Sequence, residues 1–83
     1  MEQKIKQKGI IIGLNIRRIR LEQHLKQTEL VRMLQLESVD ITREQLVKME
    51  RGTQHITAAQ LRGFRDCLKT TYAELLKETE QFL

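Results

Sequence analysis

Hydrophobic residues recur every three or four positions along most of the chain, which is the spacing of one face of an α-helix. This pattern predicts a first helix over about 10–23 and a second over about 27–36. Residues 1–9 are polar and lysine-rich, and we expect them to form a flexible basic N-terminus ahead of a single domain, 10–83. The residues expected to face the core from the first two helices are Ile12, Ile16, Ile19, Leu30, Val31 and Leu34.

Threonines precede the three later helices. Thr42 is a suitable N-cap with Gln45 as its capping-box partner, and Gly52 is a suitable C-terminal stop. Thr57 is an N-cap candidate for a fourth helix, and a fifth is expected to start after Thr71. The apolar residues on these last two helices are Leu61, Phe64, Leu68, Tyr72, Leu75, Leu76 and Phe82. Because the chain has no proline, the pattern predicts an all-α domain of five helices.

The net charge of +4 is distributed unevenly along the chain. Residues 1–26 contain seven Lys or Arg against two Glu, whereas 27–51 contain four basic and five acidic residues. A partner with dense negative charge would fit the N-terminal surplus, and a solvated basic tail would fit it as well.

Few residues suit catalysis or metal binding. One cysteine, Cys67, excludes an internal disulfide or a multi-thiolate zinc site, and we expect it to be buried as a small apolar residue. His24 and His55 lack the spacing to a carboxylate or thiol that a metal site or nucleophile dyad needs. We therefore expect no enzymatic activity, metal or cofactor. The longest apolar run, 10–12, is far short of a membrane span, so we expect a cytoplasmic protein.

Two opposite charges are predicted to lie at the margin of the core. Glu50 follows Leu46 by four residues in the third helix, and Arg20 follows Ile16 by four residues in the first. Since residues four apart share a helix face, we expect both charges on the buried side of their helices. They would then form a hydrogen-bonded ion pair that joins the third helix to the first, and deleting one member would cost about 3–5 kcal/mol.

The outward face of the third helix is polar. With Leu46 and Met49 directed inward, this face holds Arg43, Glu44, Val47, Lys48 and Arg51. Such side chains can donate to guanine, accept from cytosine or touch a thymine methyl in the major groove of DNA. An ordinary solvated helix has a similar composition. Two short amphipathic helices with this outward face have the layout of a helix-turn-helix DNA reader.

Two motifs in one register with Arg20 are more specific: Gln27-x-Glu29-Leu30 and Met49-Glu50-Arg51-Gly52. The pattern continues through Gly13, Ile16, Arg17, Leu25, Leu34, Leu46, Leu68 and Ala73-Glu74-Leu75-Leu76. Over about residues 12–76 the chain resembles the phage-repressor, or Cro/XRE-type, helix-turn-helix family. This resemblance implies a five-helix bundle of the lambda-repressor-like type.

The resemblance also implies roles for individual residues. Arg20 and Glu50 would be the internal ion pair of the family, in agreement with their expected burial. The residues that would read bases are Arg43, Glu44, Val47 and Lys48. The residues that would contact DNA phosphates are Arg17, Lys26, Gln27, Thr42, Arg51, Thr53 and Gln54.

The chain departs from the family pattern at three points. Lys26 stands where the family usually has a Ser or Thr helix cap. Between the second and third helices there are about five extra residues without glycine, which predicts an enlarged loop over 36–40. Within this insertion we expect Leu36, Val39 and Ile41 to join the core. Glu44 and its locally negative segment weaken non-specific attraction to phosphates.

Two functions are consistent with these features. The first is a bacterial or phage-encoded transcriptional regulator, a repressor that binds double-stranded DNA sequence-specifically through helix 42–51. Weak monomeric binding favours a homodimer on a pseudo-palindromic operator, with reading helices ~34 Å apart. The expected dimer contacts, which could instead pack on the core, are Tyr72, Leu76, Phe82 and Leu83. A regulatory protein or peptide would relieve binding.

The second is a protein-interaction module with the same fold, anti-repressor or antitoxin-like, that does not read DNA. The near-neutral third-helix segment, the altered turn and the apolar C-terminus favour this alternative. Steep salt dependence of binding to duplex DNA would favour the first function over the second, because such dependence comes from phosphate contacts.

Overall fold

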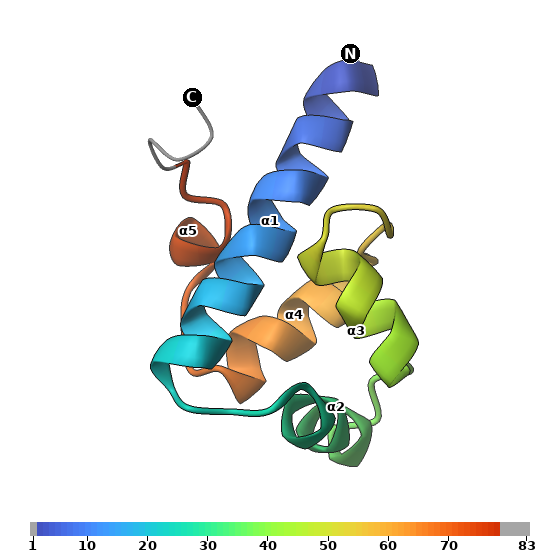
Figure 1. Cartoon of the computed structure of the whole chain (residues 1–83), viewed down its shortest axis with the longest axis vertical. Coiled ribbons are helices and arrows are strands. Elements are labelled where there is room, and N and C mark those ends of the chain that lie inside the picture. The colour runs from blue at the N-terminus through green and yellow to red at the C-terminus, as the bar shows by residue number, and fades with distance from the viewer. Residues whose placement is uncertain (1, 79–83) are drawn as a thin grey trace.

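The computed structural model describes residues 2–78, and all regular secondary structure in them is helical (Figure 1). The longest helix, α1, forms the axis of the molecule, and α3 and α5 pack against opposite sides of it. Helix α2 closes one end of the bundle, where it contacts both α3 and α4. The helices are α1 (Glu2–Glu22), α2 (Gln27–Leu36), α3 (Arg43–Glu50), α4 (Ala58–Cys67) and α5 (Tyr72–Leu75).

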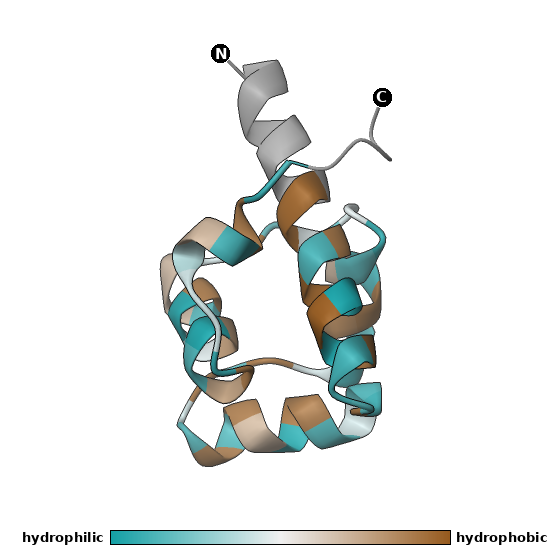
Figure 2. Ribbon diagram, turned by 90° about the vertical axis from the view of Figure 1, so that its left-hand side faces the viewer, coloured by the Kyte–Doolittle hydropathy of each residue, from teal (hydrophilic) through white to brown (hydrophobic). Residues whose placement is uncertain are grey.

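The core lies where α1, α2, α3 and α4 converge. Each of these helices carries both hydrophobic and hydrophilic residues (Figure 2). Most of the predicted core residues are confirmed, including Ile16, Leu30 and Leu34, whose side chains are completely buried. The largest fully buried hydrophobic side chains are Phe64, Ile16, Leu30, Leu34, Ile41, Leu46, Met49, Leu68 and Leu75.

The predicted helix caps are confirmed. The hydroxyls of Thr42 and Thr57 accept hydrogen bonds from the backbone N–H groups of Gln45 and Gln60, at 3.1 Å in both cases. Both glutamine side chains accept in return from the N–H of the capping threonine, at 3.0 Å. Gly52 adopts a φ of 77°, the left-handed conformation that ends a helix and that glycine adopts without strain.

Both ends of the chain differ from the predicted layout. Helix α1 begins at Glu2 rather than at about residue 10, because Lys, Gln and Glu are good helix formers and no proline interrupts them. Helix α5 is a single turn that ends at Leu75, so the predicted longer fifth helix is not present in the described residues. Phe82 lies outside those residues.

One predicted core residue is wrong. Leu36 is 77% exposed, although Ile41 is buried and Val39 packs against the core as expected. Because α2 remains helical through Leu36, this residue lies about 200° around the helix from Leu34 and faces away from the core.

The connection between α2 and α3, residues 37–42, is held at two points. The side-chain amide of Gln35 donates to the carbonyl of Ile41 at 2.9 Å, and that of Gln60 in α4 donates to the carbonyl of Asp40 at 3.0 Å. These bonds fix the loop and therefore the start of α3. None of the helices described combines the length and hydrophobicity that crossing a bilayer requires.

Candidate nucleic-acid interface

A bidentate ion pair joins α1 to α3. The Nε atom of Arg20 lies 2.7 Å from Oε2 of Glu50, and Nη2 of Arg20 lies 2.9 Å from Oε1. The exposed fractions of the two side chains are 8% and 3%, so the predicted buried pair is confirmed. Nη1 of Arg20 also donates to the carbonyl of Leu25 at 2.8 Å, which satisfies another donor of the buried guanidinium.

Gln27 extends this network to α2. Its Nε2 atom donates to Oε1 of Glu50 at 3.0 Å, so one carboxylate connects side chains from three helices. Gln27 was predicted to contact a DNA phosphate, and this bond occupies one of its two amide N–H groups. The network therefore fixes the start of α2 relative to the end of α3.

Gly13 allows α1 and α3 to approach each other closely. A Cβ atom placed on Gly13 would lie 1.8 Å from the carbonyl oxygen of Met49, which is a backbone atom of α3. No other residue type fits this position without separating the two helices. The close approach sets the distance between α1 and the outward face of α3.

Two adjoining hollows lie along the α1–α3 junction. The first, of about 460 Å³, opens between α1 and the beginnings of α2 and α3, and the second, of about 610 Å³, follows α3. Both are lined by Arg17, Gln27 and Arg43. We call them together the basic hollows. Their complete lining is Leu14, Arg17, Arg20, Lys26, Gln27, Thr28, Arg43, Val47, Glu50 and Arg51.

The charge of the basic hollows is strongly positive. Glu50 is the sole acidic residue in the two linings, and it is paired with Arg20. The other charged residues there are Arg17, Lys26, Arg43 and Arg51, all of them exposed. Four cations around a concave surface attract a chain of phosphates much more than isolated surface cations do.

Six of the predicted DNA contacts therefore meet at one surface: Arg17, Lys26, Gln27, Arg43, Val47 and Arg51. Glu44 and Lys48, two predicted base-reading residues, are exposed on α3 but do not line the hollows. Sequence reasoning missed Leu14 and Thr28. Leu14 could have been found, because it lies one helical turn before Arg17 on α1.

Two of the three remaining predicted phosphate contacts have partners within the chain. The hydroxyl of Thr42 caps α3, and that of Thr53 donates to the carbonyl of Lys48 at 3.2 Å. Gln54 is half-buried. These bonds stabilise the two ends of α3, so Thr42 and Thr53 have a structural role whether or not they contact a ligand.

The first turn of α2 differs from those of α3, α4 and α5. Each of the latter three begins after a threonine whose hydroxyl accepts from a first-turn N–H group. Lys26 makes no such bond, because an ammonium group cannot accept. The backbone N–H of Lys26 donates to a carboxylate oxygen of Glu29 at 2.8 Å. The first-turn N–H groups of α2, beside the first hollow, therefore lack a side-chain cap and can donate to an anion.

Asn15 was not predicted from the sequence. Its Nδ2 atom donates to the carbonyls of Leu75 and Lys77, each at 2.8 Å, and its side chain is 1% exposed. It fastens the C-terminal segment to α1. The signal was present, because Asn15 falls within the apolar stripe between Ile12 and Ile19.

The predicted dimer contacts are described in part. Tyr72 and Leu76 are 38% and 43% exposed on or beside α5, and the guanidinium of Arg65 lies 4.7 Å from the centre of the Tyr72 ring. Phe82 and Leu83 lie outside the described residues. The surface that includes Tyr72 and Leu76 is therefore partly apolar and accessible.

Titratable groups suited to chemistry are scarce in the described residues. Burial, followed by the charges of Glu37 and Asp66, raises the pKa of the Cys67 thiol above its ordinary value. No group of three metal-ligating side chains comes together between residues 2 and 78. Comparison of the chain with protein-family models, curated proteins and solved structures gave no match.

Proposed function

We propose that this chain is a sequence-specific DNA-binding transcriptional regulator of the phage-repressor-like helix-turn-helix type. In this proposal α2 and α3 are the two helices of the motif, α3 enters the major groove, and the protein represses by occupying an operator. The single observation that supports it most strongly is the convergence of Arg17, Lys26, Arg43 and Arg51 on the basic hollows beside α3.

Phosphates would be bound at both ends of α3. Arg17 and Lys26 stand at the first hollow with the uncapped first turn of α2, and Arg51 stands at the far end of the second. Contacts of this kind position a protein on the duplex without selecting a sequence. The rigid Arg20–Glu50–Gln27 network holds these contacts in fixed register, so little conformational entropy is lost on binding.

Bases would be read from the exposed face of α3. Arg43 can donate two hydrogen bonds to guanine, and Val47, one turn later, can contact a thymine methyl. Lys48 and Glu44 lie beside them and would contact the flanking bases. A recognition helix usually contacts bases through its N-terminal residues, which supports a leading role for Arg43 at the first position of α3.

Two copies would bind a pseudo-palindromic operator. The segment with Tyr72 and Leu76 is the candidate contact between copies, since it is apolar and exposed. A two-fold dimer would place its reading helices about 34 Å apart, one turn of the double helix.

The test is in-vitro selection of random duplex DNA on the purified protein, with Arg43→Ala and Arg32→Ala compared in parallel. Each variant removes one exposed cation, but Arg32 lies on α2 away from the basic hollows. The wild type and Arg32→Ala should recover the same two-fold symmetric motif, and Arg43→Ala should lose it. Folded protein that enriches no sequence would overturn the proposal in favour of a protein-interaction module.

A further inference from the structure

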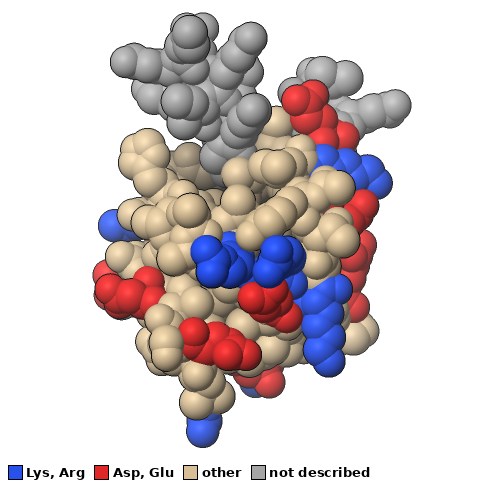
Figure 3. All heavy atoms as spheres, turned by 180° about the vertical axis from the view of Figure 1, so that it is seen from behind, with Lys and Arg blue, Asp and Glu red and all other residues tan. Residues whose placement is uncertain are grey.

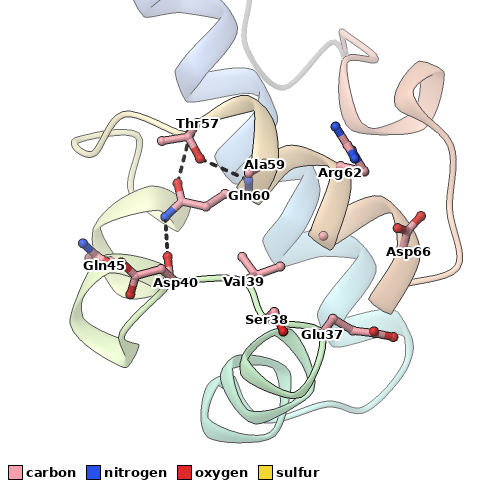
Figure 4. A pocket seen from close by; sticks show the side chains of 11 residues that line it. Glu37, Ser38, Val39, Asp40, Gln45, Thr57, Ala59, Gln60, Arg62 and Asp66 are labelled. Carbon is pink, nitrogen blue, oxygen red and sulfur yellow. Dashed lines mark hydrogen bonds between the residues drawn. The ribbon is translucent and has the colours of Figure 1, made fainter.

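A third hollow, of about 630 Å³, lies between the α2–α3 loop and α4 (Figure 4). Its volume is within the range of sites that hold a ligand or a short peptide segment. Carboxylates from Glu37 and Asp40 on the loop and Asp66 on α4 line it, against one lining cation, Arg62, and Asp66 is paired with Arg65 at 2.9 Å. We call it the acidic hollow.

The acidic side chains stand on more than one wall. In Figure 4, Asp40 lies on one side of Val39, and Glu37 and Asp66 lie on the other. All three residues are exposed, so a ligand in the hollow can reach Glu37 and Asp40 directly, whereas it must compete with Arg65 for Asp66. A cationic side chain placed over Val39 would therefore be attracted from both sides.

The floor of the acidic hollow is firmly packed. A Cβ atom on Gly63 would lie 2.8 Å from Cγ2 of Val39 and 3.0 Å from Cδ2 of Leu34, so α4 and the loop are in close contact there. The buried side chain of Gln60 accepts from the N–H of Thr57 and donates to the carbonyl of Asp40. The hollow is thus formed before any ligand arrives, which lowers the entropic cost of binding.

The acidic hollow and the basic hollows lie on different sides of α3. Gln45 lines the acidic hollow, whereas Arg43 and Val47, two positions before and after it, line the basic hollows. Two positions correspond to about 200° around a helix. The chain has a net charge of +4, and Figure 3 shows basic and acidic side chains interspersed on the rear face. The acidic hollow differs in that acidic residues outnumber basic ones in its lining, three to one.

We propose that the acidic hollow is a docking site for a lysine- or arginine-bearing segment of a partner protein. Charge complementarity selects this occupant, because Glu37 and Asp40, on opposite sides of Val39, would attract a cationic side chain and repel an acidic segment or a nucleic acid. If α3 binds DNA as proposed above, the partner can be held at the same time, since the two ligands meet different sides of α3. Docking itself does not depend on DNA binding.

The test is an NMR titration of the labelled protein, without DNA, with capped peptides of equal length that carry three arginines, three lysines or three glutamates. The matched variants are Glu37→Gln with Asp40→Asn, inside the hollow, and Glu22→Gln with Glu78→Gln, outside it. Each pair removes two exposed carboxylates. The arginine and lysine peptides should shift amide signals of Ser38, Val39 and Gly63, and the glutamate peptide should not.

The first variant pair should bind the cationic peptides about tenfold more weakly, as expected for the loss of two exposed ion pairs, and the second pair should bind like wild type. Equal weakening by both pairs, or shifts scattered over every surface carboxylate, would overturn the proposal. The outcomes of the titration and of the DNA selection separate the two proposals. If the peptides bind but the selection enriches no DNA sequence, only the DNA-binding proposal is refuted. If the selection enriches a DNA sequence but the peptides do not bind, only the docking site is refuted.

Discussion

Helix α1 is attached to its two neighbours by different chemistry. Its junction with α3 is charged and very close, with the Arg20–Glu50 pair at 2.7 Å and Gly13 against the backbone of α3. At its junction with α5 the buried contact is neutral, with Asn15 donating to two backbone carbonyls, and the ion pair there, Arg18–Glu74 at 3.6 Å, is partly exposed. A buried charge that loses its partner is more costly than a carbonyl that loses its donor. From their buried groups we call these the charged and the neutral junction, and the charged junction is also the one beside the basic hollows.

Variants at the charged junction should lose the most stability. Glu50→Ala leaves the Arg20 guanidinium buried without its carboxylate, and we expect the free energy of unfolding to fall by about 3–5 kcal/mol. Urea denaturation followed by circular dichroism measures this change. The double variant Arg20→Met with Glu50→Leu should recover much of the loss, because both buried charges are then removed. No difference between the single and double variants would contradict this account.

Adding a methyl group at the charged junction should lower the free energy of unfolding by nearly as much. In Gly13→Ala the new Cβ would meet the carbonyl oxygen of Met49, and a backbone atom cannot move aside cheaply. We expect a loss of about 3 kcal/mol in unfolding free energy, at the upper end for overpacking. Gly63→Ala is the matched control, because its Cβ would meet only side-chain methyl groups. The control should lose clearly less stability, because side-chain methyl groups can shift and a backbone carbonyl cannot, while the gain of about 1 kcal/mol in helix propensity is common to both sites.

Variants at the neutral junction should lose less stability. Asn15→Ala removes both donors to Leu75 and Lys77, and we expect unfolding free energy to fall by about 1–3 kcal/mol. Amide exchange near Tyr72 should accelerate, because α5 loses its attachment to α1. Asn15→Ala should lose less affinity for selected DNA than Glu50→Ala, because the basic hollows lie at the α1–α3 junction.

A smaller, pH-dependent effect lies outside both junctions. The pKa of Cys67 is raised above its ordinary value of 9.0, so the folded state keeps a proton that the unfolded chain releases. Stability from this source is fully present below pH 9 and declines as pH rises through the higher folded value. Comparing unfolding of wild type and Cys67→Ala between pH 8 and pH 10 isolates it. A decline of equal size in both proteins would show that other groups cause it.

Some features of both junctions and of the core can be predicted from the sequence, and others cannot. Local signals sufficed for the caps at Thr42 and Thr57, and helical spacing sufficed for the Arg20–Glu50 pair. Leu36 was assigned to the core because it is apolar, although the predicted helix over 27–36 already places it about 200° around the axis from Leu34. The start of α1 and the end of α5 were not predicted, because a helix end is decided by a balance of weak terms that one sequence does not reveal.

The candidate site could be predicted as a set of residues but not as a shape. The outward face of α3 follows from helical geometry, and Arg43, Val47 and Arg51 lie in or beside the basic hollows as expected. That Lys48 lies outside the hollows depends on where α1 crosses α3. Gly13 decides this crossing through a contact 36 residues distant in sequence, with Met49, and no local pattern encodes it.

The uncapped first turn of α2 implies a trade-off between stability and affinity. Replacing Lys26 with Ser would supply the hydroxyl that Thr42, Thr57 and Thr71 supply elsewhere, and a good cap stabilises a helix by about 1 kcal/mol. The same change would remove a cation and satisfy the N–H groups that an anion would otherwise bind. The free protein would become more stable and the proposed complex weaker. Lys26 therefore leaves the start of α2 without a side-chain cap in the free protein, and in the proposed complex a phosphate would take that place.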